Sequence, residues 1–156
     1  MEKNQKNILW FSEISLKDVP LVGGKNAALG EMFSNLAELG VAVPNGFAVT
    51  ASAYQKFLDQ AKLGDKISQI LLGLNTKKIN DLQKRGRDIR QLILDAALPP
   101  KLEEEISKSY QALGKLYFKN PDVAVRSSAT AEDLPGASFA GQQETFLNVV
   151  GEKDVL

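Results

Sequence analysis

Two glycines precede a lysine at the start of a predicted helix, in the stretch "LVGGKNAALG". Gly23 and Gly24 allow the backbone to come close to a ligand. Free amide groups and the helix dipole at such a junction favour an anion, and Lys25 adds a positive charge. This is not a Walker A loop, which requires serine or threonine after the lysine, where this chain has Asn26. A glycine turn with a solvated lysine is the alternative, and the stretch alone leaves both interpretations open.

An arginine ends the apolar segment "VAVR" near the C-terminal end of the sequence. The planar guanidinium of Arg126 can bind phosphate oxygens at two points. Hydroxyl side chains follow at Ser127, Ser128 and Thr130. The alternative is a structural ion pair between Arg126 and either Glu132 or Asp133.

A long segment rich in small residues, 129–143, separates two predicted strands. Hairpin loops usually have about two to five residues, and much longer loops are usually functional or disordered. Small residues let a loop lie against a polyphosphate with its amides pointing inward. We therefore predict a lid here. The candidate lid residues are Ser128, Thr130, Gly136, Ser138, Phe139, Ala140 and Gln142.

Acidic side chains near the lid give only a weak metal signal. Glu132, Asp133 and Glu144 are scattered, which is more typical of a solvated face than of a magnesium site. No metal ligand is predicted in this chain. A lysine at a glycine–helix junction, an arginine at a strand end and a small-residue lid together fit a nucleoside triphosphate, since phosphoryl transfer depends mostly on positioning and charge neutralisation.

Composition excludes several other functions. The chain has 156 residues and contains neither histidine nor cysteine, so it cannot supply an imidazole base, a phosphohistidine or a catalytic thiolate. Its 19 basic and 19 acidic residues balance, which argues against binding nucleic acid or a membrane surface through bulk charge. No signal peptide and no apolar run of about 20 residues is present, so we expect a cytoplasmic protein.

The elements that must position these residues follow from periodicity. An α+β domain is expected, with helices packed on a small, mostly antiparallel sheet. The first helix should bury a stripe of large side chains, and Thr50 or Ser52, and then Thr76, should cap later helices. Predicted strands are Ile8–Phe11, Phe47–Val49, Val123–Ser127 and Thr145–Val150. The predicted stripe is Leu29, Met32, Phe33, Leu36 and Leu39.

Two motifs in the chain resemble a known family. "VGGKNAALGEM…GVAVPNGFAVT" and "AVRSSATAEDLPGASFAGQQETFLNV" are similar to the N-terminal ATP-binding region of the phosphoenolpyruvate synthases (pyruvate, water dikinases), within the wider phosphoenolpyruvate-utilising dikinases. The resemblance covers essentially the whole chain and is most specific in 21–58 and 122–151. The segment "LPGASFAGQQ" lacks the methionine-rich lid of pyruvate, phosphate dikinases, which favours the synthase branch or the rifampicin phosphotransferases.

The resemblance implies that residues 1–156 are the first half of an ATP-grasp domain in a longer, multidomain enzyme. In that family the residues matching Lys25 and Arg126 contact ATP, and those matching Gly141 and Thr145 line the phosphates. The family enzyme converts ATP, pyruvate and water to AMP, phosphoenolpyruvate and phosphate in gluconeogenesis, through a histidine in a later domain.

This chain is therefore expected to hold no catalytic residue and to be inactive alone. ATP is the expected ligand, with Mg²⁺ held mainly by the second half, and pyruvate bound by the remaining domains of the same protein. A non-catalytic nucleotide-binding module is the alternative from another functional class.

Overall fold

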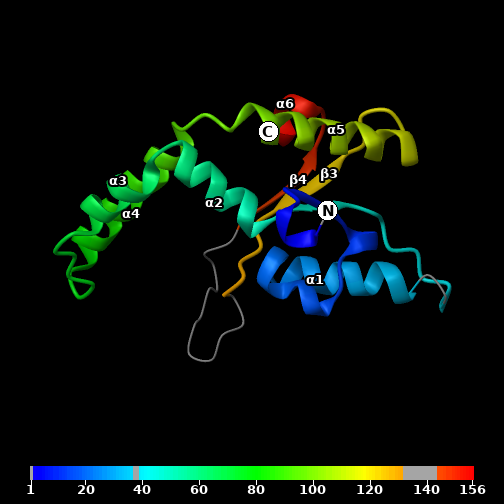
Figure 1. The fold of residues 1–156 in the computed structure, drawn as a ribbon, viewed down its shortest axis with the longest axis horizontal. Helices are drawn as coiled ribbons and strands as arrows, with labels where there is room; N and C mark the ends of the chain where they lie inside the picture. The colour runs from blue at the N-terminus through cyan, green and yellow to red at the C-terminus, as the bar shows by residue number, and fades with distance from the viewer. Residues whose placement is uncertain (1, 37–38, 132–143) are drawn as a thin grey trace. The chain divides into compact units, whose positions relative to one another are not determined.

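The computed structural model describes residues 2–36, 39–131 and 144–156, which form two compact units (Figure 1). Unit 1 combines Met1–Ala53 with Lys101–Leu156, and unit 2 is Tyr54–Pro100. The predicted α+β class is confirmed. The helices are α1 (Val19–Leu36), α2 (Ala51–Gln60), α3 (Leu63–Leu71), α4 (Ile79–Leu94), α5 (Pro100–Leu116) and α6 (Glu152–Val155). The strands are β1 (Ile8–Trp10), β2 (Phe47–Val49), β3 (Val123–Arg126) and β4 (Thr145–Val149).

Strands β1 and β2 form an antiparallel pair at the centre of the N-terminal core of unit 1. Leu9 lies opposite Ala48, and both side chains are buried. The rings of Trp10 and Phe47 are 5.7 Å apart on the opposite face of the pair, as the alternation of side chains along a strand requires. The buried cluster consists of Leu9, Ile14, Val22, Ala27 and Ala48.

Helix α1 packs through its small residues, which corrects the predicted stripe. Ala27 and Gly30 are buried, whereas Met32 is 39% exposed. A Cβ atom added at Gly30 would lie 2.6 Å from both Cβ and the carbonyl oxygen of Ile14. The helix therefore approaches the preceding segment so closely that only small side chains fit between them. Of the predicted stripe, Leu29, Phe33 and Leu36 are half-buried, and Met32 and Leu39 are exposed.

A short 3-10 turn, η3 (Leu16–Asp18), leads into α1 and is fixed by one carboxylate. Oδ2 of Asp18 accepts hydrogen bonds from Nζ of Lys3 at 2.8 Å, and from the amide and hydroxyl of Ser15 at 2.8 and 3.0 Å. Burial raises the pKa of Asp18, but the hydrogen bonds from Lys3 and Ser15 lower it more, so the pKa lies below its usual value. Asp18 thus stabilises the fold above its unfolded-state pKa of about 3.9, and this contribution is lost as the pH falls through the lower folded-state pKa.

Asp18→Asn should remove this pH dependence. At pH 7 we expect the variant to lose about 1–3 kcal/mol of unfolding free energy, because it loses charge-assisted hydrogen bonds at a buried site. The difference from wild type should shrink as the pH falls below about 4. Urea denaturation at several pH values measures this, with the exposed Asp122→Asn as control. A difference that stays constant down to pH 2 would contradict the assignment.

Strands β3 and β4 form the predicted antiparallel hairpin, with Val125 opposite Phe146. Tyr110 of α5 anchors the base of this hairpin: its buried hydroxyl donates to the Pro121 carbonyl at 2.8 Å and accepts from the Gly151 amide at 2.7 Å. One side chain therefore holds the segment that enters β3 and the segment that leaves β4. Arg126 lies at the other end of the hairpin, where β3 leads into the connection to β4.

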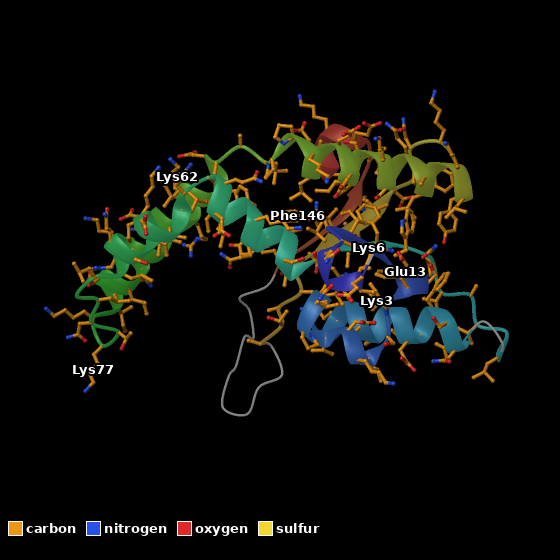
Figure 2. All side chains as sticks on the ribbon, in the orientation of Figure 1. Lys3, Lys6, Glu13, Lys62, Lys77 and Phe146 are labelled. Atoms are coloured by element: carbon orange, nitrogen blue, oxygen red, sulfur yellow. The ribbon has the colours of Figure 1, made fainter. Side chains whose placement is uncertain are left out.

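Unit 2 is helical and positively charged. It contains nine lysine and arginine residues against five aspartates, a net charge of +4 in a chain whose total is zero. Lys62 and Lys77 are among its exposed cations (Figure 2). No helix among the described residues is long and apolar enough to cross a membrane.

The predicted cap at Thr76 is wrong. Helix α4 begins after Lys78, whose side chain makes no capping hydrogen bond. Asn75 organises this turn instead, since its side chain accepts from the Lys77 amide and its carbonyl accepts from the Lys78 amide. The prediction at the earlier helix is confirmed, because Oγ1 of Thr50 accepts from the Ala53 amide at 3.2 Å.

Candidate phosphate-binding site

The glycine turn and the segment after β3 lie in direct contact, although they are far apart in sequence. Oγ of Ser128 donates to the carbonyl of Val22 at 2.9 Å, across 106 positions. A Cβ atom added at Gly23 would lie 2.2 Å from that hydroxyl and 2.9 Å from the Ala129 carbonyl oxygen. The two motifs singled out by the sequence therefore meet at one place in unit 1.

Gly23 marks a break within α1: a short helical turn precedes it, and the longer helix begins after it, as the sequence predicts. Its φ of 79° and ψ of 162° are not helical. The Val22 carbonyl accepts a second hydrogen bond, from Nδ2 of Asn26 at 2.9 Å. We call the two hydrogen bonds donated by Ser128 and Asn26 to this carbonyl the Val22 tie. Helical geometry resumes after Gly23, so Lys25 lies in the first turn of the resumed helix, where amide groups and the dipole favour an anion.

Arg126 is the last residue of β3 and is exposed. It lies opposite Thr145, so the two candidate residues are cross-strand neighbours at the loop end of the hairpin. The amide of Ser127 donates to the Glu144 carbonyl at 3.2 Å and closes the pairing just beyond them. The hairpin thus presents one guanidinium and one hydroxyl side by side.

The alternative ion pair of Arg126 with Glu132 or Asp133 involves residues outside the described ranges and stays untested. Within 2–36, 39–131 and 144–156, no carboxylate forms a salt bridge with Arg126. The guanidinium is therefore not committed to any acid of the described chain. This arrangement suits a residue that binds an external anion.

The structure places some of the candidate residues and leaves others undescribed. Lys25 and Thr130 are exposed, and Ser128 is half-buried with its hydroxyl donated to Val22. The remaining predicted lid residues lie outside the described residues, as does one predicted phosphate-lining glycine: these are Gly136, Ser138, Phe139, Ala140, Gln142 and Gly141. In the described part of the chain, no group of three or more acidic, histidine or cysteine residues is arranged to hold a metal ion.

Asn26 is the residue whose structural role the sequence did not indicate. In the sequence, Asn26 shows only that the Walker A pattern is not met. In the structure, its side-chain amide donates a hydrogen bond to the Val22 carbonyl, next to the break in α1. The sequence feature that could have indicated this role is the position of Asn26, four residues after Val22. An amide side chain can replace a backbone donor one helical turn away.

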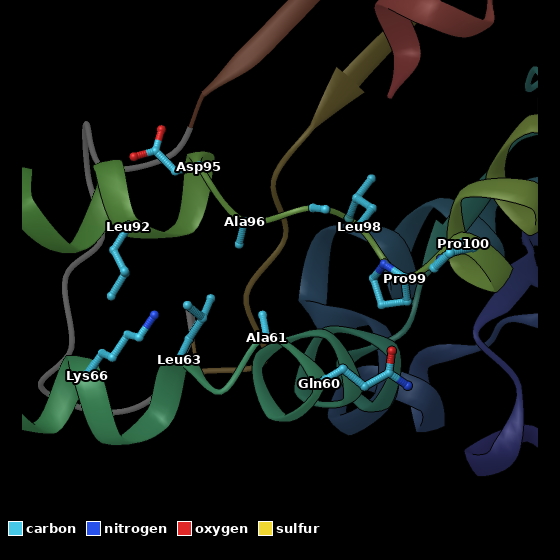
Figure 3. Close-up of a pocket in the computed structure, with 11 residues that line it drawn as sticks. Gln60, Ala61, Leu63, Lys66, Leu92, Asp95, Ala96, Leu98, Pro99 and Pro100 are labelled. Atoms are coloured by element: carbon cyan, nitrogen blue, oxygen red, sulfur yellow. The ribbon is translucent and has the colours of Figure 1, made fainter.

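A separate cavity of about 500 Å³ lies within unit 2 (Figure 3). Leu63, Leu92 and Leu98 give it an aliphatic lining, and Lys66 and Asp95 are its charged groups. None of the predicted site residues lines it. It provides no part of the phosphate-binding arrangement described above.

Comparison with known proteins identifies the family. Residues 19–156 match the family described as "Pyruvate phosphate dikinase, AMP/ATP-binding domain". The chain is 55% identical over 157 aligned positions to the phosphoenolpyruvate synthase of Aquifex aeolicus, covering 100% of this chain and 18% of that protein. It is 50% identical over 149 positions to the phosphoenolpyruvate synthase of Escherichia coli K12, covering 96% of this chain and 19% of that protein.

The chain is also 50% identical over 159 positions to the probable phosphoenolpyruvate synthase of Staphylothermus marinus, covering 99% of this chain and 18% of that protein. The chain thus spans about a fifth of the length of the relatives it matches. The match to the family covers well over half of the sequence, and the chain belongs to the pyruvate phosphate dikinase AMP/ATP-binding domain family.

Proposed function

We propose that this chain is the N-terminal half of an ATP-grasp domain in a phosphoenolpyruvate synthase, and that its role is to bind the phosphates of ATP. The contact between the glycine turn and the segment after β3 carries the proposal. It brings the helix start that bears Lys25 and the strand end that bears Arg126 to one place. Two cations on rigid elements around a close backbone approach are what polyphosphate binding requires.

Within this proposal each residue has a definite role. Lys25 neutralises phosphate charge at the helix start, and Arg126 binds phosphate oxygens with its fork. Thr145 donates its hydroxyl beside Arg126, and Gly141 with the rest of the lid contributes backbone amides from the loop. Mg²⁺ is expected to be held mainly by acids of the second half, because the described part of this chain offers no acidic cluster.

The activity of the whole protein is proposed from its relatives. They are named phosphoenolpyruvate synthases and are about five times longer than this chain, which leaves room for a second ATP-grasp half, a carrier histidine and a pyruvate site. These names favour pyruvate over an antibiotic as the phosphoryl acceptor. The lack of histidine in this chain places any phosphohistidine step in another domain.

Calorimetric titration of Mg-ATP tests the proposal with two samples, the 156-residue chain and the full-length protein. The full-length protein should bind ATP clearly more tightly. The chain alone should bind on the order of millimolar, about −4 kcal/mol, because one face of the ligand stays in water and screening weakens the charge contacts. Low-micromolar binding by the chain alone would show a self-contained site and contradict the half-domain assignment. A full-length protein that does not bind ATP would reject the function altogether.

A further inference from the structure

We propose that Ser128 is a positioning residue, which fixes the two cationic elements of the site relative to each other by donating its hydroxyl to the Val22 carbonyl. This inference rests on the proposed ATP-binding function. It gives Ser128 a different part from the direct lid contact that the sequence suggested.

The Val22 carbonyl needs donors because the helix breaks immediately after it. Val22 is 3% exposed, so water does not readily reach this group. Gly23 departs from helical geometry, and the carbonyl receives Nδ2 of Asn26 from the same helix and Oγ of Ser128 from the other segment, each at 2.9 Å. Buried carbonyl groups are nearly always hydrogen-bonded, so both donors satisfy a real requirement. Only the one from Ser128 joins two segments.

The space at Gly23 shows that the contact is closely fitted. Any side chain at Gly23 would place its Cβ atom 2.2 Å from the Ser128 hydroxyl and 3.0 Å from the Ala129 carbonyl carbon. The left-handed φ of 79° independently favours glycine at this position. The absence of a side chain at one position and the hydroxyl at the other are thus complementary parts of one contact.

The Val22 tie lies close to both cations along the chain. Lys25 is two residues beyond Gly23, and Arg126 is two residues before Ser128. Two residues span at most about 7 Å of backbone, so little freedom remains between the tie and either cation. A hydroxyl already donated to Val22 cannot also donate to a phosphate. Ser128 therefore acts on ATP through Lys25 and Arg126.

Ser128→Ala in the full-length protein tests the role, with Mg-ATP affinity and melting temperature as the two measurements. Ser109→Ala is the matched control, because the hydroxyl of Ser109 also donates to a backbone carbonyl, that of Glu105 at 2.8 Å in α5. We expect Ser128→Ala to weaken Mg-ATP binding about tenfold, as loss of one hydrogen bond can do, while the control binds as wild type. Both variants should lower the melting temperature by similar amounts. Ser128→Thr, which keeps the hydroxyl, should restore most of the affinity.

Wild-type affinity in a folded Ser128→Ala variant would overturn the inference, as would an equal loss of affinity in Ser109→Ala. Should Ser128→Ala fail to fold, Ser128→Cys carries the test, because it keeps the size and shape of the side chain but leaves only a weak donor toward the Val22 carbonyl. Wild-type ATP affinity in that variant would overturn the positioning role. Arg126→Ala separates this inference from the proposed function. If Arg126→Ala loses affinity and Ser128→Ala does not, the positioning role fails and the ATP site stands, whereas no loss in Arg126→Ala rejects the site itself.

Discussion

Arg126→Ala should weaken Mg-ATP binding to the full-length protein at least about thirtyfold. Truncating one partner of a close, hydrogen-bonded charge pair typically costs about 2–5 kcal/mol, and 2 kcal/mol corresponds to about thirtyfold. The guanidinium ends a strand that is paired with β4, and no acid in the described residues binds it. The strand pairing therefore fixes the backbone at Arg126, and the proposed role of its guanidinium is to bind the phosphates of ATP. Calorimetric titration measures the affinity directly.

Two further variants sharpen this result. Arg126→Lys keeps the charge but loses the planar fork, so it should recover only part of the affinity. Arg90→Ala removes an exposed arginine from α4 in unit 2 and should bind ATP as wild type. If Arg90→Ala and Arg126→Ala weaken binding equally, general charge rather than a specific contact explains the effect. If neither does, Arg126 is not an ATP ligand.

Gly30→Ala should destabilise unit 1 by about 1–2 kcal/mol. Two opposing effects meet at this position. Alanine in place of glycine favours a helix by about 1 kcal/mol. The new Cβ atom, however, would lie 2.6 Å from Cβ and the carbonyl oxygen of Ile14, in a contact where backbone cannot rotate away. Overpacking of a tight core costs about 1–3 kcal/mol or more, and here the clash includes backbone, so we expect it to exceed the gain.

The fluorescence of Trp10 reports this change, because it is the single tryptophan of the chain and its strand belongs to unit 1. Urea denaturation followed by this signal should show a lower midpoint for Gly30→Ala. Gly64→Ala is the control, since an added Cβ atom in α3 meets no atom within 4 Å. It should leave the tryptophan transition unchanged. A Gly30→Ala variant as stable as wild type would mean that α1 moves away from Ile14 at little cost.

Much of the fold was predictable because local patterns decide it. The four strands and the hairpin follow from short apolar runs bounded by turn residues, and α5 follows from its prolines and apolar spacing. The buried face of α1 was not predictable in this way. An analysis of hydrophobic periodicity selects the large apolar side chains as the buried ones. This helix instead buries Ala27 and Gly30, because the segment at Ile14 approaches Gly30 closely.

The candidate site shows the same division. Residue types predicted Lys25, Arg126 and the hydroxyl groups after it, since these are the groups that bind phosphate. The contact between the two motifs could not be predicted from either motif, because it is a tertiary hydrogen bond across 106 positions. The sequence also suggested that Ser128 faces the ligand, whereas its hydroxyl is donated to the protein's own backbone. Which partner a hydroxyl chooses depends on the unsatisfied carbonyl nearby, and the break at Gly23 creates that carbonyl.

The discontinuous sequence of unit 1 has a consequence for the order of events during synthesis. All five members of the N-terminal core cluster lie between Leu9 and Ala48, so this cluster can pack before the rest of the unit exists. Ser128 follows Ala48 by 80 positions, which take about 4–16 seconds at about 5–20 residues per second. During that interval the glycine turn can already lie on a packed core. The contact with Ser128 can form only after β3 has been synthesised, and the proposed phosphate site also needs Thr145, the first residue of β4.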